Sequence, residues 1–142
     1  MKSLRILGVD YGTVRTGIAV SDEMGMMAHG VKNIFGRTPE KVADGIAEMV
    51  KEYGVKTIVI GFPKNMNNTV GERGEAALLL KGILETLVEC EIVMWDERLT
   101  TVSAHNALNF TNVSGRKKRD VVDIVAAEII LQVYLDFKNK KG

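Results

Sequence analysis

Carboxylate side chains stand at three places where this sequence predicts the end of a strand or the start of a helix. Asp10 follows an apolar segment, and Asp96 and Glu97 end another. Asp123 lies at the start of an apolar C-terminal segment. If the strand ends share one edge of a sheet, these acids converge. Oxygen ligands without histidine or cysteine suit Mg²⁺ or Mn²⁺, and such a cluster can carry metal-assisted hydrolysis of a phosphodiester.

Asp10 is the acid with the strongest local context. A carboxylate after the buried-strand residues Ile6, Leu7 and Val9 loses hydration unless a cation, a proton or several donors compensate it. Gly12 and Gly17 bracket a tight reversal, so the segment reads as a hairpin with an acid at its mouth. On local grounds alone, closure of a turn with Gly12 is an equally good interpretation of Asp10.

The other acids also have alternatives. Asp120 and Asp123 have the spacing of a helix N-cap and its third residue, and for Asp123 taken alone this capping role is favoured. Asp96 and Glu97 point to opposite faces of a strand, so only one of them can face Asp10. The longer reach of Glu97 favours it as the ligand, and Asp96 takes its place if the strand ends early.

Basic residues accompany the acids. Arg15 lies in the hairpin tip, Lys64 follows a buried strand, and Arg98 follows Glu97. A run of four basic residues, 116–119, precedes Asp123. Such a run more often forms a solvated surface, but the position of this one before Asp123 favours contact with phosphate. The candidate nucleic-acid-binding residues are Arg15, Lys64, Arg98, Arg116, Lys117, Lys118 and Arg119.

The elements that must position these residues follow from apolar periodicity and from helix and strand stop signals. After the hairpin, strands and helices alternate, which favours parallel pairing. Beyond the hairpin we expect a strand within 30–36, a helix from Thr38–Pro39 to Gly54, a strand over 55–61, a helix over about 70–89, a strand over 91–98, a short helix over 99–108, a basic loop over 111–119 and a buried helix over 120–138.

Composition bounds the class of protein. A chain of 142 residues with 46% hydrophobic content is the size of one domain with one core. The single cysteine excludes an internal disulfide. With only two histidines, far apart in the sequence, a zinc site of cysteine and histidine ligands is improbable. No apolar run approaches the ~20 residues that span a bilayer, so we expect a soluble cytoplasmic protein without a membrane partner. The net charge of +1 provides no global basic field, so a polyanion must be held by local clusters.

Four motifs stand out at the segments 8–22, 61–66, 96–101 and 117–127. They resemble the YqgF/RuvX family of RNase H-like proteins, whose members are named pre-16S rRNA nucleases or Holliday junction resolvases. The motifs cover nearly the whole chain in the family's order. The departures are Phe62, where an aliphatic residue is usual, and Asn67-Asn68, which replaces the usual Asp-Gly.

The resemblance implies one RNase H-like nuclease domain over residues 1–142, of α/β class, with a five-stranded mixed sheet of order 3-2-1-4-5 flanked by helices. It implies Asp10, Glu97 and Asp123 as the catalytic and metal-binding acids, with Mg²⁺ or Mn²⁺ as cofactor. The activity it implies is cleavage at the 5′ end of precursor 16S rRNA. Holliday junction resolution and non-catalytic nucleic-acid binding remain alternatives, as do a monomer and a homodimer.

A different class of protein shares the first motif. The Asp-Tyr-Gly-Thr sequence at residues 10–13 also resembles the phosphate loop of actin-like and sugar-kinase ATPases. That fold needs two such domains and a second phosphate loop, and 142 residues are too few for either. The sequence therefore favours a nuclease over an ATPase.

Overall fold

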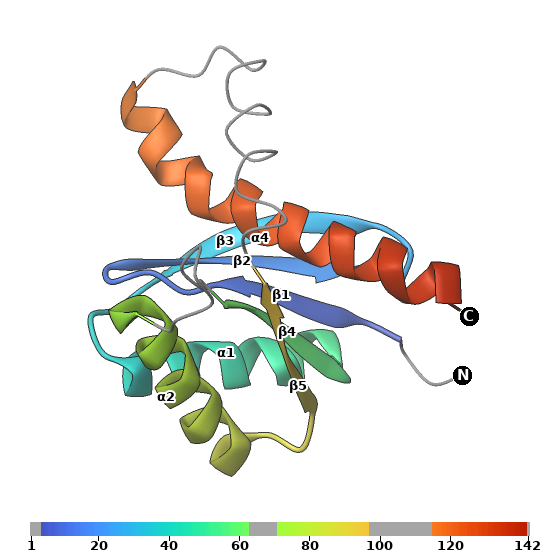
Figure 1. Ribbon diagram of the computed structural model, residues 1–142, viewed down its shortest axis with the longest axis horizontal. Coiled ribbons are helices and arrows are strands. Elements are labelled where there is room, and N and C mark those ends of the chain that lie inside the picture. The colour runs from blue at the N-terminus through green and yellow to red at the C-terminus, as the bar shows by residue number, and fades with distance from the viewer. Residues whose placement is uncertain (1–3, 63–70, 97–114, 142) are drawn as a thin grey trace.

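The computed structural model describes residues 4–62, 71–96 and 115–141, and these form a five-stranded sheet between two layers of helices (Figure 1). The strand order is β3-β2-β1-β4-β5, which confirms the expected order 3-2-1-4-5. The strands are β1 (Ile6–Asp10), β2 (Arg15–Ser21), β3 (Ala28–Phe35), β4 (Thr57–Phe62) and β5 (Glu91–Asp96).

The sheet is mixed because its two halves are connected differently. The antiparallel pairs β1–β2 and β2–β3 are joined by short reversals. The parallel pairs β1–β4 and β4–β5 need longer crossovers, which contain α1 (Pro39–Tyr53) and α2 (Glu72–Leu87). Parallel pairing places the C-terminal ends of β1, β4 and β5 at one edge of the sheet.

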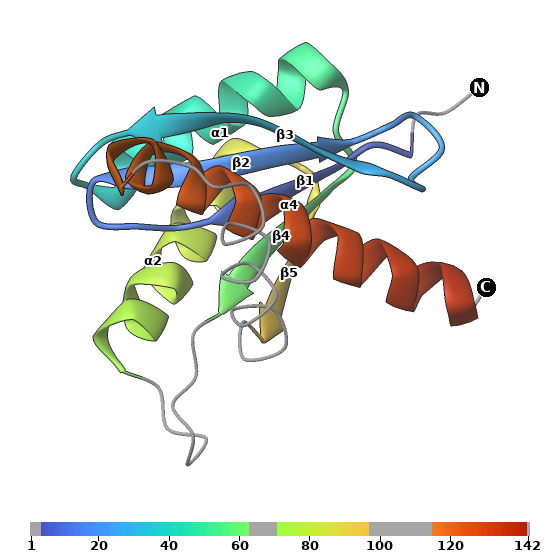
Figure 2. The ribbon, with the colours of Figure 1, turned by 90° about the horizontal axis from the view of Figure 1, so that it is seen from above.

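Helices cover both faces of the sheet. In Figures 1 and 2, α1 and α2 lie on one face and the long helix α4 (Gly115–Lys141) crosses the other. The core is accordingly divided into two buried clusters. Leu7, Val9, Ile58 and Ile60 pack toward α1 and α2, whereas Ile6 and Val59 pack toward α4.

The helix α1 begins and ends where its sequence predicts. The Thr38 hydroxyl accepts a hydrogen bond from the Lys41 backbone N–H at 3.3 Å, and Pro39 occupies the start of the helix, where its missing N–H costs nothing. Gly54 ends the helix with φ +65°, a left-handed conformation that glycine adopts without a steric penalty.

Three glycines allow α4 to approach the sheet closely. Gly8 lies on β1, Gly17 on β2 and Gly30 on β3, and a Cβ atom on any of them would collide with α4. On the edge strand β3, the Gly30 N–H also donates to a Glu128 carboxylate oxygen at 2.9 Å, and the Ala28 N–H donates to the Gln132 side chain at 2.8 Å. These bonds satisfy edge N–H groups that would otherwise be open to another strand.

The expectation of a basic loop over 111–119 is wrong for its last part. Arg116, Lys117, Lys118 and Arg119 belong to α4, which begins at Gly115 instead of Asp120. Lysine and arginine are good helix formers, and no glycine or proline separates them from the apolar part of the helix, so the helix extends back through them. The side chains of these four residues are outside what the structure describes.

A smaller difference concerns the start of β2. The strand begins at Arg15, inside the reversal expected between Gly12 and Gly17, so Arg15 and Gly17 belong to the strand instead of the turn. The expected helix over 99–108 lies outside the described residues. Within the described ranges, no helix combines the length and the apolar character that crossing a membrane requires.

Candidate functional site

Asp10 is the last residue of β1 and only 6% of it is exposed. Alternation along the strand decides which way it points. Leu7 and Val9 face α1 and α2, and Ile6 faces α4, so Asp10 shares the face covered by α4. A nearly buried carboxylate at a strand end is the arrangement that the sequence predicts for a cation-compensated acid.

Gly17 brings Asp123 to the same place. It pairs with Asp10 across the β1–β2 ladder. A Cβ atom on Gly17 would collide with the Asp123 carbonyl and would lie 2.7 Å from the Ile124 nitrogen. One residue of β2 therefore lies against the backbone of Asp123 and also pairs with Asp10, which places both acidic residues next to Gly17.

Asp123 lies well inside α4, because the helix begins at Gly115. The capping interpretation, which requires a helix start at Asp120, is therefore wrong. What the residue does contact is Arg15, whose Nε lies 3.7 Å from the Asp123 carboxylate. The two side chains are 31% and 24% exposed, so water screens the pair and it adds little stability. The ion pair places the Arg15 guanidinium next to the Asp123 carboxylate.

A hollow of about 290 Å³ opens between the hairpin tip and α4. Two hydrogen bonds hold the tip. The Gly12 N–H donates to the Thr16 hydroxyl at 3.4 Å, and the N–H of Gly36, which follows β3, donates to the Val14 carbonyl at 3.0 Å. The residues lining the hollow are Gly12, Thr13, Val14, Arg15 and Asp123. The Asp123 carboxylate in this hollow suits a bound cation, and the Arg15 guanidinium suits a phosphate beside it.

Side-chain alternation along β5 decides which face of the sheet Asp96 occupies. Val93 and Trp95 pack on the α4 face, and Met94 packs on the opposite face. By alternation, Asp96 shares the face of Met94, away from Asp10. Glu97 lies outside the described residues.

The donor chemistry near Asp10 fits a hard divalent cation. Asp10 and Asp123 both offer carboxylate oxygens, the ligands that Mg²⁺ and Mn²⁺ prefer. Among residues 4–62, 71–96 and 115–141, no group of three or more acidic, histidine or cysteine side chains gathers in one place. Two acids from this part of the chain therefore fit part of a ligand set.

Among the expected phosphate-binding residues, Arg15 is placed beside Asp123. Lys64 and Arg98 fall outside the described residues. The backbone of the run Arg116–Arg119 is placed on the first turns of α4, ahead of Asp123 along the same helix.

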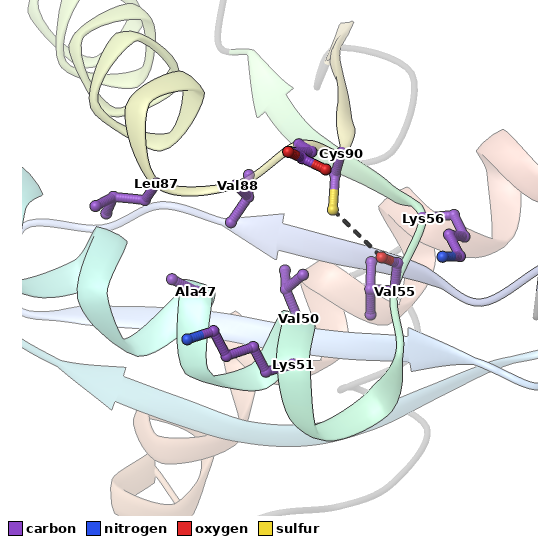
Figure 3. Close-up of a pocket in the computed structure, with 9 residues that line it drawn as sticks. Ala47, Val50, Lys51, Val55, Lys56, Leu87, Val88 and Cys90 are labelled. Carbon is purple, nitrogen blue, oxygen red and sulfur yellow. Dashed lines mark hydrogen bonds between the residues drawn. The ribbon is translucent and has the colours of Figure 1, made fainter.

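A second pocket, of about 380 Å³, lies at the opposite end of the sheet (Figure 3). It lies between the last turns of α1 and α2 and the residues that precede β4 and β5. There the Cys90 thiol donates to the Val55 carbonyl at 3.3 Å, and burial raises the pKa of that thiol. Because Val55 precedes β4 while Asp10 ends the parallel strand β1, this pocket is separate from the acids.

Sequence reasoning missed the role of Gly17. Its pairing with Asp10 and its contact with α4 require the tertiary fold, and the sequence suggested only a turn glycine. A usable signal was present, because Gly8 and Gly17 lie within predominantly apolar segments, and glycine inside a strand often marks a close approach of another backbone.

Comparison with known sequences finds close relatives. A family model described as "RuvX: Holliday junction resolvase" matches residues 4–137. A protein of Acetivibrio thermocellus named "Putative pre-16S rRNA nuclease" is 46% identical over 139 residues, covering 96% of this chain and 99% of that protein. A Bacillus subtilis protein of the same name is also 46% identical, over 96% of this chain and all of its own length.

Comparison with solved structures finds the same fold at much lower identity. RuvC of T. thermophilus in complex with a Holliday junction aligns with a TM-score of 0.62 and 13% identity, covering 98% of both chains. The Fowlpox virus resolvase bound to its junction substrate aligns with a TM-score of 0.60 and 10% identity, over 95% of this chain and 99% of the resolvase. The fold is therefore that of the RuvC-like resolvases, which confirms the expected RNase H-like class.

Proposed function

This chain belongs to the RuvX family, and from that membership we propose that it is a divalent-metal-dependent nuclease that hydrolyses phosphodiester bonds. The observation that carries the proposal is the close approach of the Asp123 backbone to Gly17, the residue that pairs with Asp10. Two acidic residues from distant parts of the chain are thereby brought to the α4 side of the sheet at the end of β1. A nearly buried carboxylate beside a second acid is stabilised when a cation binds both.

We propose Glu97 as the third acidic ligand. Asp96 lies on the face of the sheet opposite Asp10 by strand alternation, so it is poorly placed to share a cation with Asp10. Glu97 directly follows β5 and has the longer side chain. With Asp10 and Asp123 it completes the set of three oxygen donors that the described acids fill only in part.

The residues of the chain have distinct tasks in this proposal. Asp10, Glu97 and Asp123 hold the cation, and Arg15 beside Asp123 offers a guanidinium to the substrate phosphate. When bound, Mg²⁺ or Mn²⁺ supplies an activated water at neutral pH and stabilises the charge that develops on the phosphate. Lys64, Arg98 and the basic first turns of α4 position the nucleic-acid backbone.

Precursor 16S rRNA is the substrate we propose first, because the relatives named for it are 46% identical and match over nearly their whole length. The four-way DNA junction is the second candidate, because the matching family model is described as a Holliday junction resolvase. Both substrates present phosphodiesters to the same acids, so the site alone favours neither.

The test is a side-by-side cleavage assay of full-length protein with Mg²⁺ or Mn²⁺ on two substrates, an RNA spanning the 5′ boundary of 16S rRNA and a synthetic four-way DNA junction. We expect cleavage of the RNA near that boundary, with no cleavage when the metal is chelated. Cleavage of the junction alone would transfer the proposal to resolution. Binding of either substrate without metal-dependent cleavage would make the protein a non-catalytic binding factor.

The choice between the two neighbouring acids is tested by Glu97→Gln and Asp96→Asn in parallel. Removing a ligand that holds the cation in the transition state costs several kcal/mol, so Glu97→Gln should lower cleavage by roughly 100-fold or more. Asp96→Asn should stay within about tenfold of the wild type. A Mn²⁺ titration of the cleavage rate measures both. The assignment is wrong if Asp96→Asn loses turnover while Glu97→Gln keeps it.

A further inference from the structure

A third hollow borders the proposed nuclease site from the other side of the hairpin. It has a volume of about 270 Å³, just below the ~300 Å³ at which pockets for drug-sized ligands begin, so it suits a single ring system. Its walls come from the β1–β2 turn, from the segment between β3 and α1, and from the first half of α2. These three parts lie at the same end of the molecule in Figures 1 and 2. Its lining residues are Tyr11, Gly12, Thr13, Arg37, Pro39, Ala76 and Leu79.

Gly12 and Thr13 line this hollow and also the one that contains Arg15 and Asp123. The hairpin turn is therefore a shared wall, with the acids on one side and Tyr11 on the other. Strand alternation explains the division. Asp10 faces α4, and Tyr11, the next residue, packs against the core on the side of α1 and α2.

The chemistry of this hollow differs from that of the acidic site. Tyr11 offers a half-buried aromatic ring at the wall of the hollow. Leu79 is 56% exposed and presents apolar surface at the hollow. Arg37 is exposed at the rim and supplies a cation. An aromatic ring, an aliphatic wall and a guanidinium are the groups that bind an unpaired base and its phosphate.

We propose that this hollow is a base-binding subsite that accepts one unpaired base of the RNA strand whose phosphate lies at the acids. The inference rests on the proposed nuclease function and adds a specificity element to it. The base stacks on Tyr11 and contacts Leu79, while Arg37 contacts the adjoining phosphate. Because a paired base must first be unstacked and unpaired before it can enter the hollow, the subsite favours single-stranded or distorted RNA at the cleavage position.

The experiment measures binding, so it does not depend on catalysis. A short single-stranded RNA is bound by full-length protein in EDTA at one fixed salt concentration, and an abasic residue is placed at each position in turn. At one position, loss of the base should weaken wild-type binding by about 5- to 150-fold, the range expected for one stacked base. In Tyr11→Leu, the abasic RNA and the intact RNA should bind with nearly equal affinity, whereas Tyr11→Phe should keep the wild-type difference.

Leu79→Ser tests the opposite wall without touching the packed ring of Tyr11. Its matched control is Leu87→Ser, since Leu87 is a similarly exposed leucine of α2 that lines the distant pocket of Figure 3. Leu79→Ser should reduce the penalty at the same RNA position, and Leu87→Ser should leave it unchanged. Melting curves of all four variants confirm that each is folded.

The subsite is refuted if no position shows a base penalty that both Tyr11→Leu and Leu79→Ser reduce. Its failure and that of the nuclease function are distinguishable. If the protein cleaves RNA with metal but neither variant reduces a base penalty, the subsite is refuted and the nuclease function stands. If both variants reduce the penalty at one position but the protein cleaves neither test substrate, the subsite stands and the nuclease function is refuted.

Discussion

Asp10→Asn should leave the protein folded and lower metal-dependent cleavage by roughly 100-fold or more. The substitution keeps the size of a side chain that is almost buried at the end of β1, so packing is preserved. It removes one negative charge from the site shared with Asp123, which weakens the hold on a divalent cation. Loss of several kcal/mol of transition-state stabilisation corresponds to the stated factor.

Two measurements separate this role from a structural one. Without metal, the melting temperature of Asp10→Asn should equal or exceed that of the wild type, because repulsion between the acids is relieved. With Mn²⁺, the wild type should gain stability as the cation binds the folded state, and the variant should gain much less. A variant that melts much earlier than the wild type and still cleaves would make Asp10 a turn residue.

Gly17→Ala should destabilise the protein and disable the site together. The new Cβ atom would meet the backbone of Asp123 and Ile124, and a helix backbone cannot rotate away as a side chain can. Overpacking of this kind costs about 1–3 kcal/mol, and the melting temperature should fall by roughly 2–4 °C per kcal/mol at about this chain length. Cleavage should also fall, at temperatures where the variant is still folded, because Asp123 moves away from Asp10.

Gly82→Ala is the matched control for this prediction. Gly82 lies inside α2, and nothing lies within 4 Å of the position that its Cβ would occupy. Alanine there should raise the free energy of unfolding by about 0.5–1 kcal/mol, because it restricts the unfolded chain and favours a helix. Denaturant unfolding should show a lower free energy of unfolding for Gly17→Ala and a higher one for Gly82→Ala, although both replace glycine with alanine. Equal stability of Gly17→Ala and the wild type would contradict the close packing of the α4 backbone against Gly17 of β2.

Much of the fold follows from local patterns that the sequence states directly. Thr38 and Pro39 start α1, and Gly54 ends it, because capping and left-handed backbone depend on the residue itself. Alternation predicts Met94 and Trp95 on opposite faces of β5, and the structure has them so. The boundary of α4 was missed because Arg116–Arg119 carry charge without apolar periodicity, yet favour helix.

The candidate site divides in the same way. The sequence by itself determined which residue types are available: an acid ending a buried strand at Asp10, further acids at Asp96, Glu97 and Asp123, and a basic run ahead of Asp123. Only the tertiary structure decided that Asp10 faces α4, that Asp123 lies inside the helix beside Arg15, and that Gly17 joins them. The reason is physical. Helix caps and strand alternation act over a few residues, whereas the approach of α4 depends on packing between segments more than a hundred residues apart in the chain.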